Sequence, residues 1–74
     1  MVKDVETATR NVARGALRAF LEGKKSLAWV IGLIRSAGVR DERLREVFEN
    51  LKVCGNPARY YEALAACREQ GWLQ

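Results

Sequence analysis

Acidic side chains gather near the middle of this 74-residue chain, where they could share a proton or hold a metal ion. Arg43 and Arg45 alternate with them, and neither histidine nor an oxygen-rich calcium loop accompanies them. The pattern is therefore typical of a solvated helix face that is laced with ion pairs, and we expect no metal site. The acidic residues are Asp41, Glu42, Glu46 and Glu49.

The side chains needed for catalysis are scarce. The chain has no histidine, the usual general base near neutral pH, and Ser26 and Ser36 sit at a helix cap and near a helix end. No glycine-rich phosphate loop is present. Cys54 and Cys67 fall about 15 Å apart along a predicted helical hairpin, so we expect two free thiols in a reducing compartment. We expect neither an enzyme nor a cofactor.

A row of arginines is the first candidate binding surface. Their i, i+4, i+8 spacing places them along one side of a helix, and two lysines follow beyond its end. The row could bind phosphates or an acidic patch on a protein. Pairs with Glu6 and Glu22 would instead make it an ordinary solvent face. These basic residues are Arg10, Arg14, Arg18, Lys24 and Lys25.

Aromatic residues form the second candidate surface. Trp29, Tyr60, Tyr61 and Trp72 are many for so small a core, and tryptophan and tyrosine are frequent anchors of protein interfaces. The alternative is that they fill the centre of the fold. We select Trp29, Tyr61 and Trp72 as the anchors for a partner.

Capping signals divide the chain into four helices, at about residues 4–21, 27–37, 42–53 and 57–70. Asp4, Ser26, Asp41 and Asn56 with Pro57 are placed to begin them. Gly23, Gly38, Gly55 and Gly71 are placed to end them. No strand pattern or repeat is found, so residues 1–74 are predicted to be a single all-α domain, either a compact four-helix bundle or an orthogonal helical array.

The segment from Ser26 to Gly38 is the most apolar, and we expect its helix to be the centre of the fold. Gly32 inside it predicts a close approach of another backbone. The first helix is predicted to face inward with a stripe that Ala13 and Leu17 widen. The members of that stripe are Val5, Ala8, Val12, Ala16, Ala19 and Phe20.

The apolar run of this central segment is far shorter than the roughly 20 residues that cross a bilayer, so we expect no membrane span. Residues 1–8 are polar and helix-forming rather than a signal segment, which favours the cytoplasm.

These features favour a small non-catalytic protein that binds another protein stoichiometrically, as an adaptor, inhibitor or regulator. The net charge of +4 suggests a partner with an acidic patch, and a homodimer is compatible with this hypothesis. Nine arginines against four lysines and many alanines are typical of a GC-rich bacterial or phage genome. Small phage proteins that inhibit host nucleic-acid-handling complexes belong to this size class.

The alternative function is a nucleic-acid-binding regulator. It would use the arginine row or a helix-turn-helix formed by the second and third helices around Gly38. Four acidic residues against two arginines between Asp41 and Asn50 make the third helix a poor reader of DNA.

Replacing Arg10, Arg14 and Arg18 together by alanine is expected to weaken binding to a charged partner and to flatten its salt dependence, because fewer charges would contact the partner. Partner affinity measured over a salt series checks this. Unchanged affinity and unchanged salt dependence would show that the row is only solvated surface.

Overall fold

The computed structural model describes the backbone of residues 2–39 and 42–73 and the side chains of residues 7–39 and 42–73. Its described part contains four α-helices and no strand, which confirms the predicted all-α fold class. The helices are α1 (Val2–Leu21), α2 (Leu27–Ala37), α3 (Glu42–Leu51) and α4 (Pro57–Glu69).

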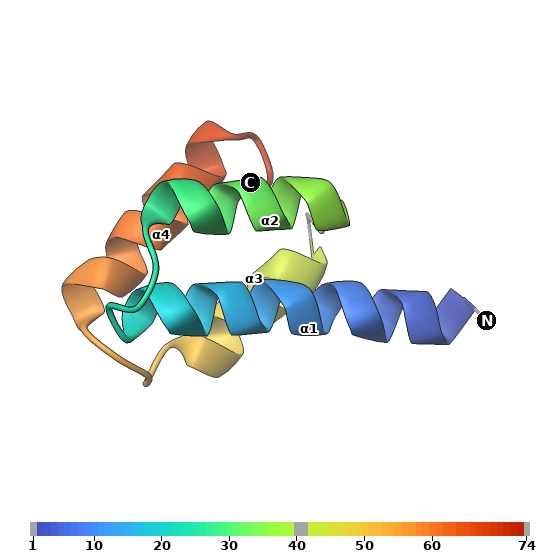
Figure 1. Ribbon diagram of the computed structural model, residues 1–74, viewed down its shortest axis with the longest axis horizontal. Helices are drawn as coiled ribbons and strands as arrows, with labels where there is room; N and C mark the ends of the chain where they lie inside the picture. The colour runs from blue at the N-terminus through green and yellow to red at the C-terminus, as the bar shows by residue number, and fades with distance from the viewer. Residues whose placement is uncertain (1, 40–41, 74) are drawn as a thin grey trace.

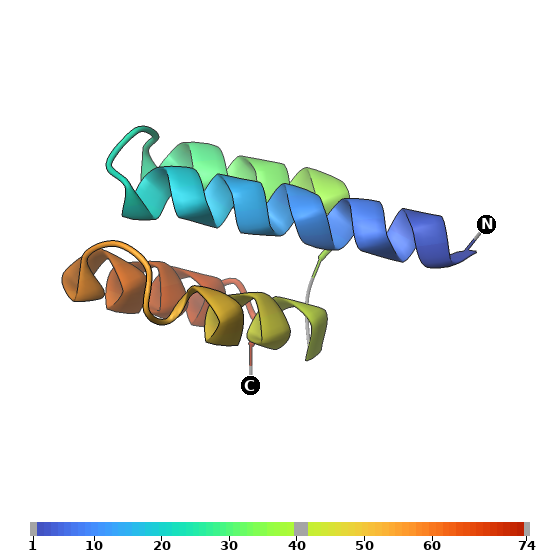
Figure 2. The same ribbon diagram turned by 90° about the horizontal axis from the view of Figure 1, so that it is seen from below.

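The helices form two layers. Helices α1 and α2 run antiparallel in one layer, and α3 and α4 make the other layer beneath them (Figures 1 and 2). Helix α1 contacts α2, α3 and α4, whereas α3 packs mainly against α1. The 20 residues of α1 rise about 30 Å, which is most of the 36 Å long axis of the molecule.

The central helix is thus α1, and the prediction that α2 is central was wrong. Only Val30 and Ile34 of α2 are fully buried, while Ala28, Trp29 and Gly32 are exposed. One face of this 11-residue helix lies against α1 and α4, and another face lies in solvent. Its apolar composition reflects partial burial of several flanks, not enclosure.

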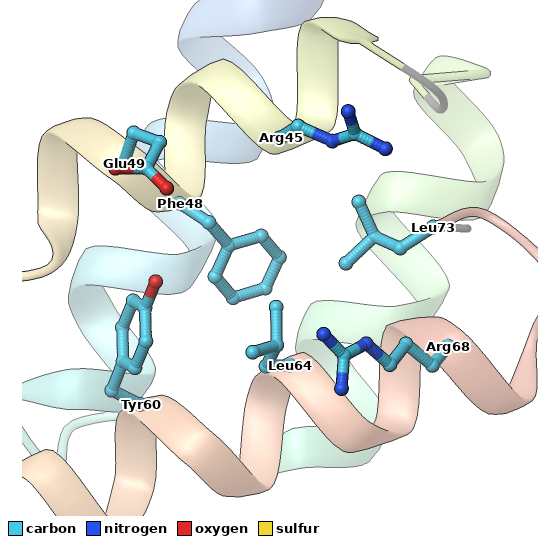
Figure 3. Close-up of a pocket in the computed structure, with 7 residues that line it drawn as sticks. All are labelled: Arg45, Phe48, Glu49, Tyr60, Leu64, Arg68 and Leu73. Atoms are coloured by element: carbon cyan, nitrogen blue, oxygen red, sulfur yellow. The ribbon is translucent and has the colours of Figure 1, made fainter.

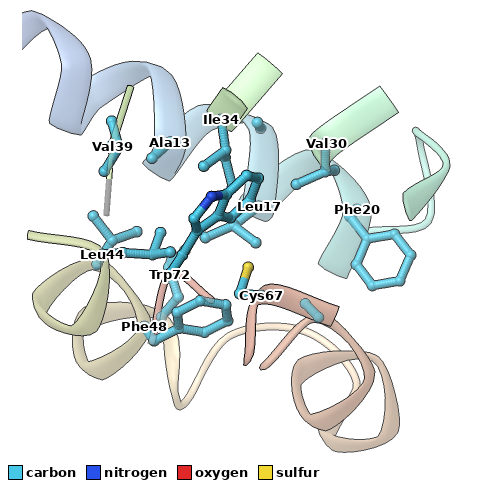
Figure 4. Packing of buried hydrophobic residues seen from close by; sticks show 14 of the residues in the cluster. Ala13, Leu17, Phe20, Val30, Ile34, Val39, Leu44, Phe48, Cys67 and Trp72 are labelled. Atoms are coloured by element: carbon cyan, nitrogen blue, oxygen red, sulfur yellow. The ribbon is translucent and has the colours of Figure 1, made fainter. Parts of the chain in front are cut away.

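The core lies between the two layers and draws on every helix (Figure 4). Helix α1 contributes small residues, Ala13 and Ala16, beside Leu17, which lets neighbouring helices come near. The buried apolar residues are Ala13, Ala16, Leu17, Phe20, Leu21, Val30, Ile34, Val39, Leu44, Val47, Phe48, Leu51, Tyr60, Ala63, Cys67, Trp72 and Leu73.

The inward stripe of α1 is rotated from the predicted one. Ala8 and Val12 are exposed, and the buried face is centred on Ala13 and Leu17. The reason is that α2 covers one flank of α1 while α3 and α4 cover the other, so the middle of the buried arc lies between them. Ala16 and Phe20 are buried as predicted.

Two predicted N-caps are confirmed. The Ser26 side chain accepts a hydrogen bond from the Trp29 amide at 3.2 Å, and the Asn56 side chain accepts one from the Ala58 amide at 2.9 Å. Pro57 follows Asn56 at the start of α4. Because α1 begins at Val2, Asp4 lies inside the helix and does not cap it. The predicted cap Asp41 lies outside the described residues.

Glycines end the helices largely as predicted. Gly71 has a φ of +78°, and the amides of Gly71 and Trp72 donate to the carbonyls of Arg68 and Cys67 at 3.0 and 3.1 Å. These two bonds make a Schellman ending that turns the chain back toward α4. Helix α4 itself stops at Glu69, one residue before the predicted end.

Helix α3 ends at Leu51, two residues before the predicted boundary, and the chain turns through residues 52–55. There Gly55, with a φ of +66°, comes so near α1 that an added Cβ would lie 2.8 Å from the Leu21 carbonyl oxygen. Gly55 is therefore the glycine at a close approach. The same role predicted for Gly32 was wrong, since an added Cβ there meets nothing within 4 Å.

A matched pair of glycine substitutions tests this assignment. We expect Gly55→Ala to destabilise the protein by about 1–3 kcal/mol, because alanine disfavours positive φ and its Cβ would clash with Leu21. Gly32→Ala is expected to stabilise it by up to ~1 kcal/mol through helix propensity. Urea unfolding followed by circular dichroism measures both, and a destabilising Gly32→Ala would contradict the structure.

The buried thiol of Cys67 makes the stability of the fold depend on pH. Both cysteines are free, and Cys67 is fully buried in the core. Burial raises the pKa of the Cys67 thiol from 9.0 to about 11, because the thiolate would be poorly solvated there.

The folded protein therefore holds the Cys67 proton more tightly than the unfolded chain does. The contribution of the Cys67 thiol to the free energy of unfolding is fully present below pH 9. This contribution is lost as the pH rises toward 11, by at most about 1.4 kcal/mol per pH unit. Urea unfolding between pH 8 and 11 should show a shallower decline for Cys67→Ala than for the native chain. Equal slopes would mean that this thiol does not couple folding to pH.

Candidate functional site

The three arginines of the α1 row differ in burial and in their contacts. Arg10 is half-buried, and its guanidinium lies 3.4 Å from the Glu46 carboxylate of α3. Arg14 is also half-buried, and its Nε has no hydrogen-bond partner among the described residues. Arg18 alone of the three is exposed. The row does not present three equivalent cations to a partner.

The lysines beyond α1 are engaged with nearby side chains. Lys24 pairs with Glu22 at 3.2 Å, so Glu22 binds a lysine here rather than the predicted Arg18. The Lys25 ammonium lies 5.1 Å from the centre of the Trp29 ring, a cation–π contact. Trp29 is 39% exposed, with part of its ring close to this lysine.

The other two predicted anchors differ sharply in exposure. Tyr61 on α4 is 61% exposed, and its ring packs edge-on against Tyr60 with 5.3 Å between ring centres. Trp72 is buried and points into the core (Figure 4). Its ring packs within this chain and is not an exposed anchor.

The predicted site residues therefore do not converge on one surface. Arg18 and Trp29 belong to the α1/α2 layer, and Tyr61 belongs to the α3/α4 layer (Figure 2). The structure instead shows a hollow between α3 and α4, which we call the α3–α4 groove (Figure 3). Its volume is about 180 Å³, and its lining residues are Arg45, Phe48, Glu49, Tyr60, Leu64, Arg68 and Leu73.

The groove exists because α3 and α4 do not pack closely on each other. Each lies against α1, and large side chains span the space between them. Phe48 of α3 and Tyr60 of α4 meet edge to face with 5.7 Å between ring centres. Beyond this aromatic pair, the side chains leave the hollow unfilled.

The two ends of the groove differ in charge. Phe48 and Leu64 provide an apolar surface between them, and Arg45 of α3 and Arg68 of α4 lie on either side of Leu73 (Figure 3). At the opposite end are the Glu49 carboxylate and the Tyr60 hydroxyl. The groove is thus apolar in the middle, positive at one end and acidic at the other.

Burial raises the pKa of the Tyr60 hydroxyl, and the Glu49 carboxylate and Tyr61 raise it further. The positive charge of Arg68 opposes the increase. Since the pKa lies above its ordinary value of 10.0, the hydroxyl is protonated at neutral pH and can donate a hydrogen bond.

The size and chemistry of the groove suit a single large side chain. Small-molecule sites usually enclose roughly 300–1,000 Å³, well above the 180 Å³ found here. The lining offers a phenol and a carboxylate but no nucleophile paired with a base. Nowhere in the described ranges do three or more metal-ligating side chains come together.

A second hollow of about 240 Å³ lies at the end of α2. It is lined by Ile34, Arg35, Gly38, Val39 and Trp72. Residues 40 and 41 follow Val39 directly, and residue 74 follows Leu73 of the α3–α4 groove; all three lie outside the described part of the chain. We base the functional site on the α3–α4 groove, because aromatic and charged side chains of two helices line it.

Comparisons with family models, curated proteins and solved structures find no match to this chain. In residues 2–39 and 42–73, no helix has the length and apolar character needed to span a bilayer.

The sequence does not predict most of the groove. Its pattern places Arg45 on a solvated face and singles out neither Leu64 nor Arg68 as a binding residue. One signal was available: Arg45 and Glu49 are one turn apart on α3, and Leu64 and Arg68 are one turn apart on α4. Spacing alone does not say that these two faces meet.

Proposed function

We propose that the protein acts by binding another protein stoichiometrically, as an adaptor, inhibitor or regulator, and that the α3–α4 groove is its docking surface. The observation that carries this proposal is a side-chain-sized hollow with apolar side chains in its middle and charged side chains at its two ends. Interfaces depend on a few anchors that fill such pockets, and arginine and tyrosine are common among them.

The surroundings of the groove support the same function. Tyr61 is exposed and packs on Tyr60, which lines the groove, so it extends the apolar surface outward. An exposed aromatic residue that packs against the lining of a preformed hollow is typical of a surface that a partner covers.

In its narrower form, the proposal makes the protein a cytoplasmic inhibitor encoded by a phage or mobile element. Its partner would then belong to a host nucleic-acid-handling complex. The small size, the net charge of +4 and the preference for arginine over lysine support this version. Homodimerisation through the groove is the other outcome that the same surface allows.

The second candidate function is binding of nucleic acid through α1. Arg18 is exposed, and Lys25 lies beyond the end of the same helix. The Arg10–Glu46 ion pair reduces the positive charge available along the row. The α2–α3 helix-turn-helix has less support, because α2 lies against α1 and α4 rather than pairing mainly with α3.

Affinity capture from the native host lysate tests the function, with nuclease-treated and untreated samples side by side. We expect a stoichiometric protein partner that survives nuclease. Leu64→Gln should reduce its recovery by about tenfold or more, because a polar side chain would enter the apolar anchor site. The partner identified should then bind the purified protein directly in calorimetry.

Ala65→Gln is the matched control, since Ala65 is exposed on the same helix and does not line the groove. Both variants need the native circular dichroism spectrum and thermal midpoint for the comparison to hold. Equal recovery with Leu64→Gln and Ala65→Gln would overturn the groove as docking surface. Recovery of nucleic acid alone, lost after nuclease, would favour the α1 function.

A further inference from the structure

The layer formed by α1 and α2 has a broad surface that no other described helix covers (Figures 1 and 2). On α1 this surface consists of positions spaced i, i+4, i+7 and i+11, which lie on the side of the helix opposite Arg10 and its ion pair with Glu46 of α3. On α2 it consists of positions spaced i, i+3 and i+7. We call this surface the outer face, and its residues are Ala8, Val12, Gly15, Ala19, Trp29, Gly32 and Ser36. All are exposed except the half-buried Ala19.

The outer face is apolar and uncharged. Val12 is 41% exposed and Trp29 is 39% exposed, and no residue of the face carries a charge, although 30% of the chain is charged. Arg35 lies on another side of α2, where its guanidinium donates a hydrogen bond to the Gln70 side chain at 2.5 Å. A charged group placed on the outer face would lose hydration without gaining an opposite charge. The surface that covers this face is therefore itself apolar and uncharged.

Two glycines lie on this face. Gly15 and Gly32 are inside α1 and α2, where glycine is less favourable than alanine. Packing within the described chain requires neither of them, since an added Cβ at either position meets nothing within 4 Å. They form shallow notches in the face, with room for a large side chain from outside the chain.

Trp29 and Gly32 make the outer face complementary to itself. They are one turn apart on the same side of α2, one a large ring and the other a notch. When two α2 helices lie antiparallel about a twofold axis midway between these positions, Trp29 of each copy lies opposite Gly32 of the other. Lys25, whose ammonium is 5.1 Å from the centre of the Trp29 ring, then lies opposite Ser36. Ser36 is in the last turn of α2, where the helix dipole is negative and favours a cation.

We propose that the outer face binds a second copy of this chain, with Trp29 of each copy seated on Gly32 of the other. The molecule measures 36 × 22 Å across this face, close to the roughly 800 Å² that each partner contributes to a standard interface. Because part of that outline stays uncovered, we expect a dissociation constant of about 1–100 μM. The inference does not rest on the proposed function, since the α3–α4 groove belongs to the other layer (Figure 2).

Sedimentation equilibrium of the purified full chain, over concentrations that span the expected dissociation constant, tests the inference. We expect a monomer–dimer equilibrium. Its dissociation constant should fall by about threefold between low and high salt, because each copy has a net charge of +4 and salt screens the repulsion between copies. Docking on an acidic partner or on nucleic acid has the opposite salt dependence.

Gly32→Gln should weaken the dimer by about tenfold or more, because its side chain fills the notch that receives Trp29. The space around Gly32 is open and glutamine is a better helix former, so the thermal midpoint of this variant should not fall. Ala65→Gln introduces the same side chain at an exposed position of α4 and should dimerise like the native chain.

A monomer at every concentration, a dimer that salt weakens, or equal dimerisation of Gly32→Gln and Ala65→Gln would overturn the inference. Leu64→Gln, in the α3–α4 groove, should leave the dimer intact. If Leu64→Gln breaks the dimer and Gly32→Gln does not, the copies meet through the groove and the outer face is not their interface.

Discussion

Burial of one face of α1 is the constraint on which the rest of this structure depends. In a 74-residue chain no helix can be enclosed by many others, and α1 is the element that contacts all three of its neighbours. The small side chains of Ala13 and Ala16 let the neighbouring helices approach α1 closely, and Leu17 and Phe20 fill the space between the layers. The other helices are held by what they bury against α1, so their contacts with one another are secondary.

The groove is a consequence of that arrangement. Helices α3 and α4 both turn their apolar faces toward the interior, and Gly55 fixes their connection close to Leu21 at the end of α1. Arg59 of α4 also contacts the end of α1, because its guanidinium donates a hydrogen bond to the Phe20 carbonyl at 3.4 Å. With both helices anchored from this side, the space between their outer edges is bridged only by side chains such as Phe48 and Tyr60.

The sequence predicted the helices well, because the signals that begin and end them are local. It did not predict how the helices pack on one another. Ser26, Asn56 and Gly71 act within a few residues of their own position, so their caps could be inferred without a fold. The central role of α1 and the close approach at Gly55 depend on which helices meet, and apolar composition misleads about that. The groove was missed for the same reason: Arg45 and Arg68 are 23 positions apart in the chain.

The position of Leu73 at one end of the groove depends on how α4 ends. At Gly71 the chain leaves α4 in the left-handed conformation, and the Trp72 amide donates to the Cys67 carbonyl. That reversal buries the Trp72 ring in the core and places Leu73 between Arg45 and Arg68 (Figures 3 and 4). The helix ending thus supplies part of the apolar lining of the groove.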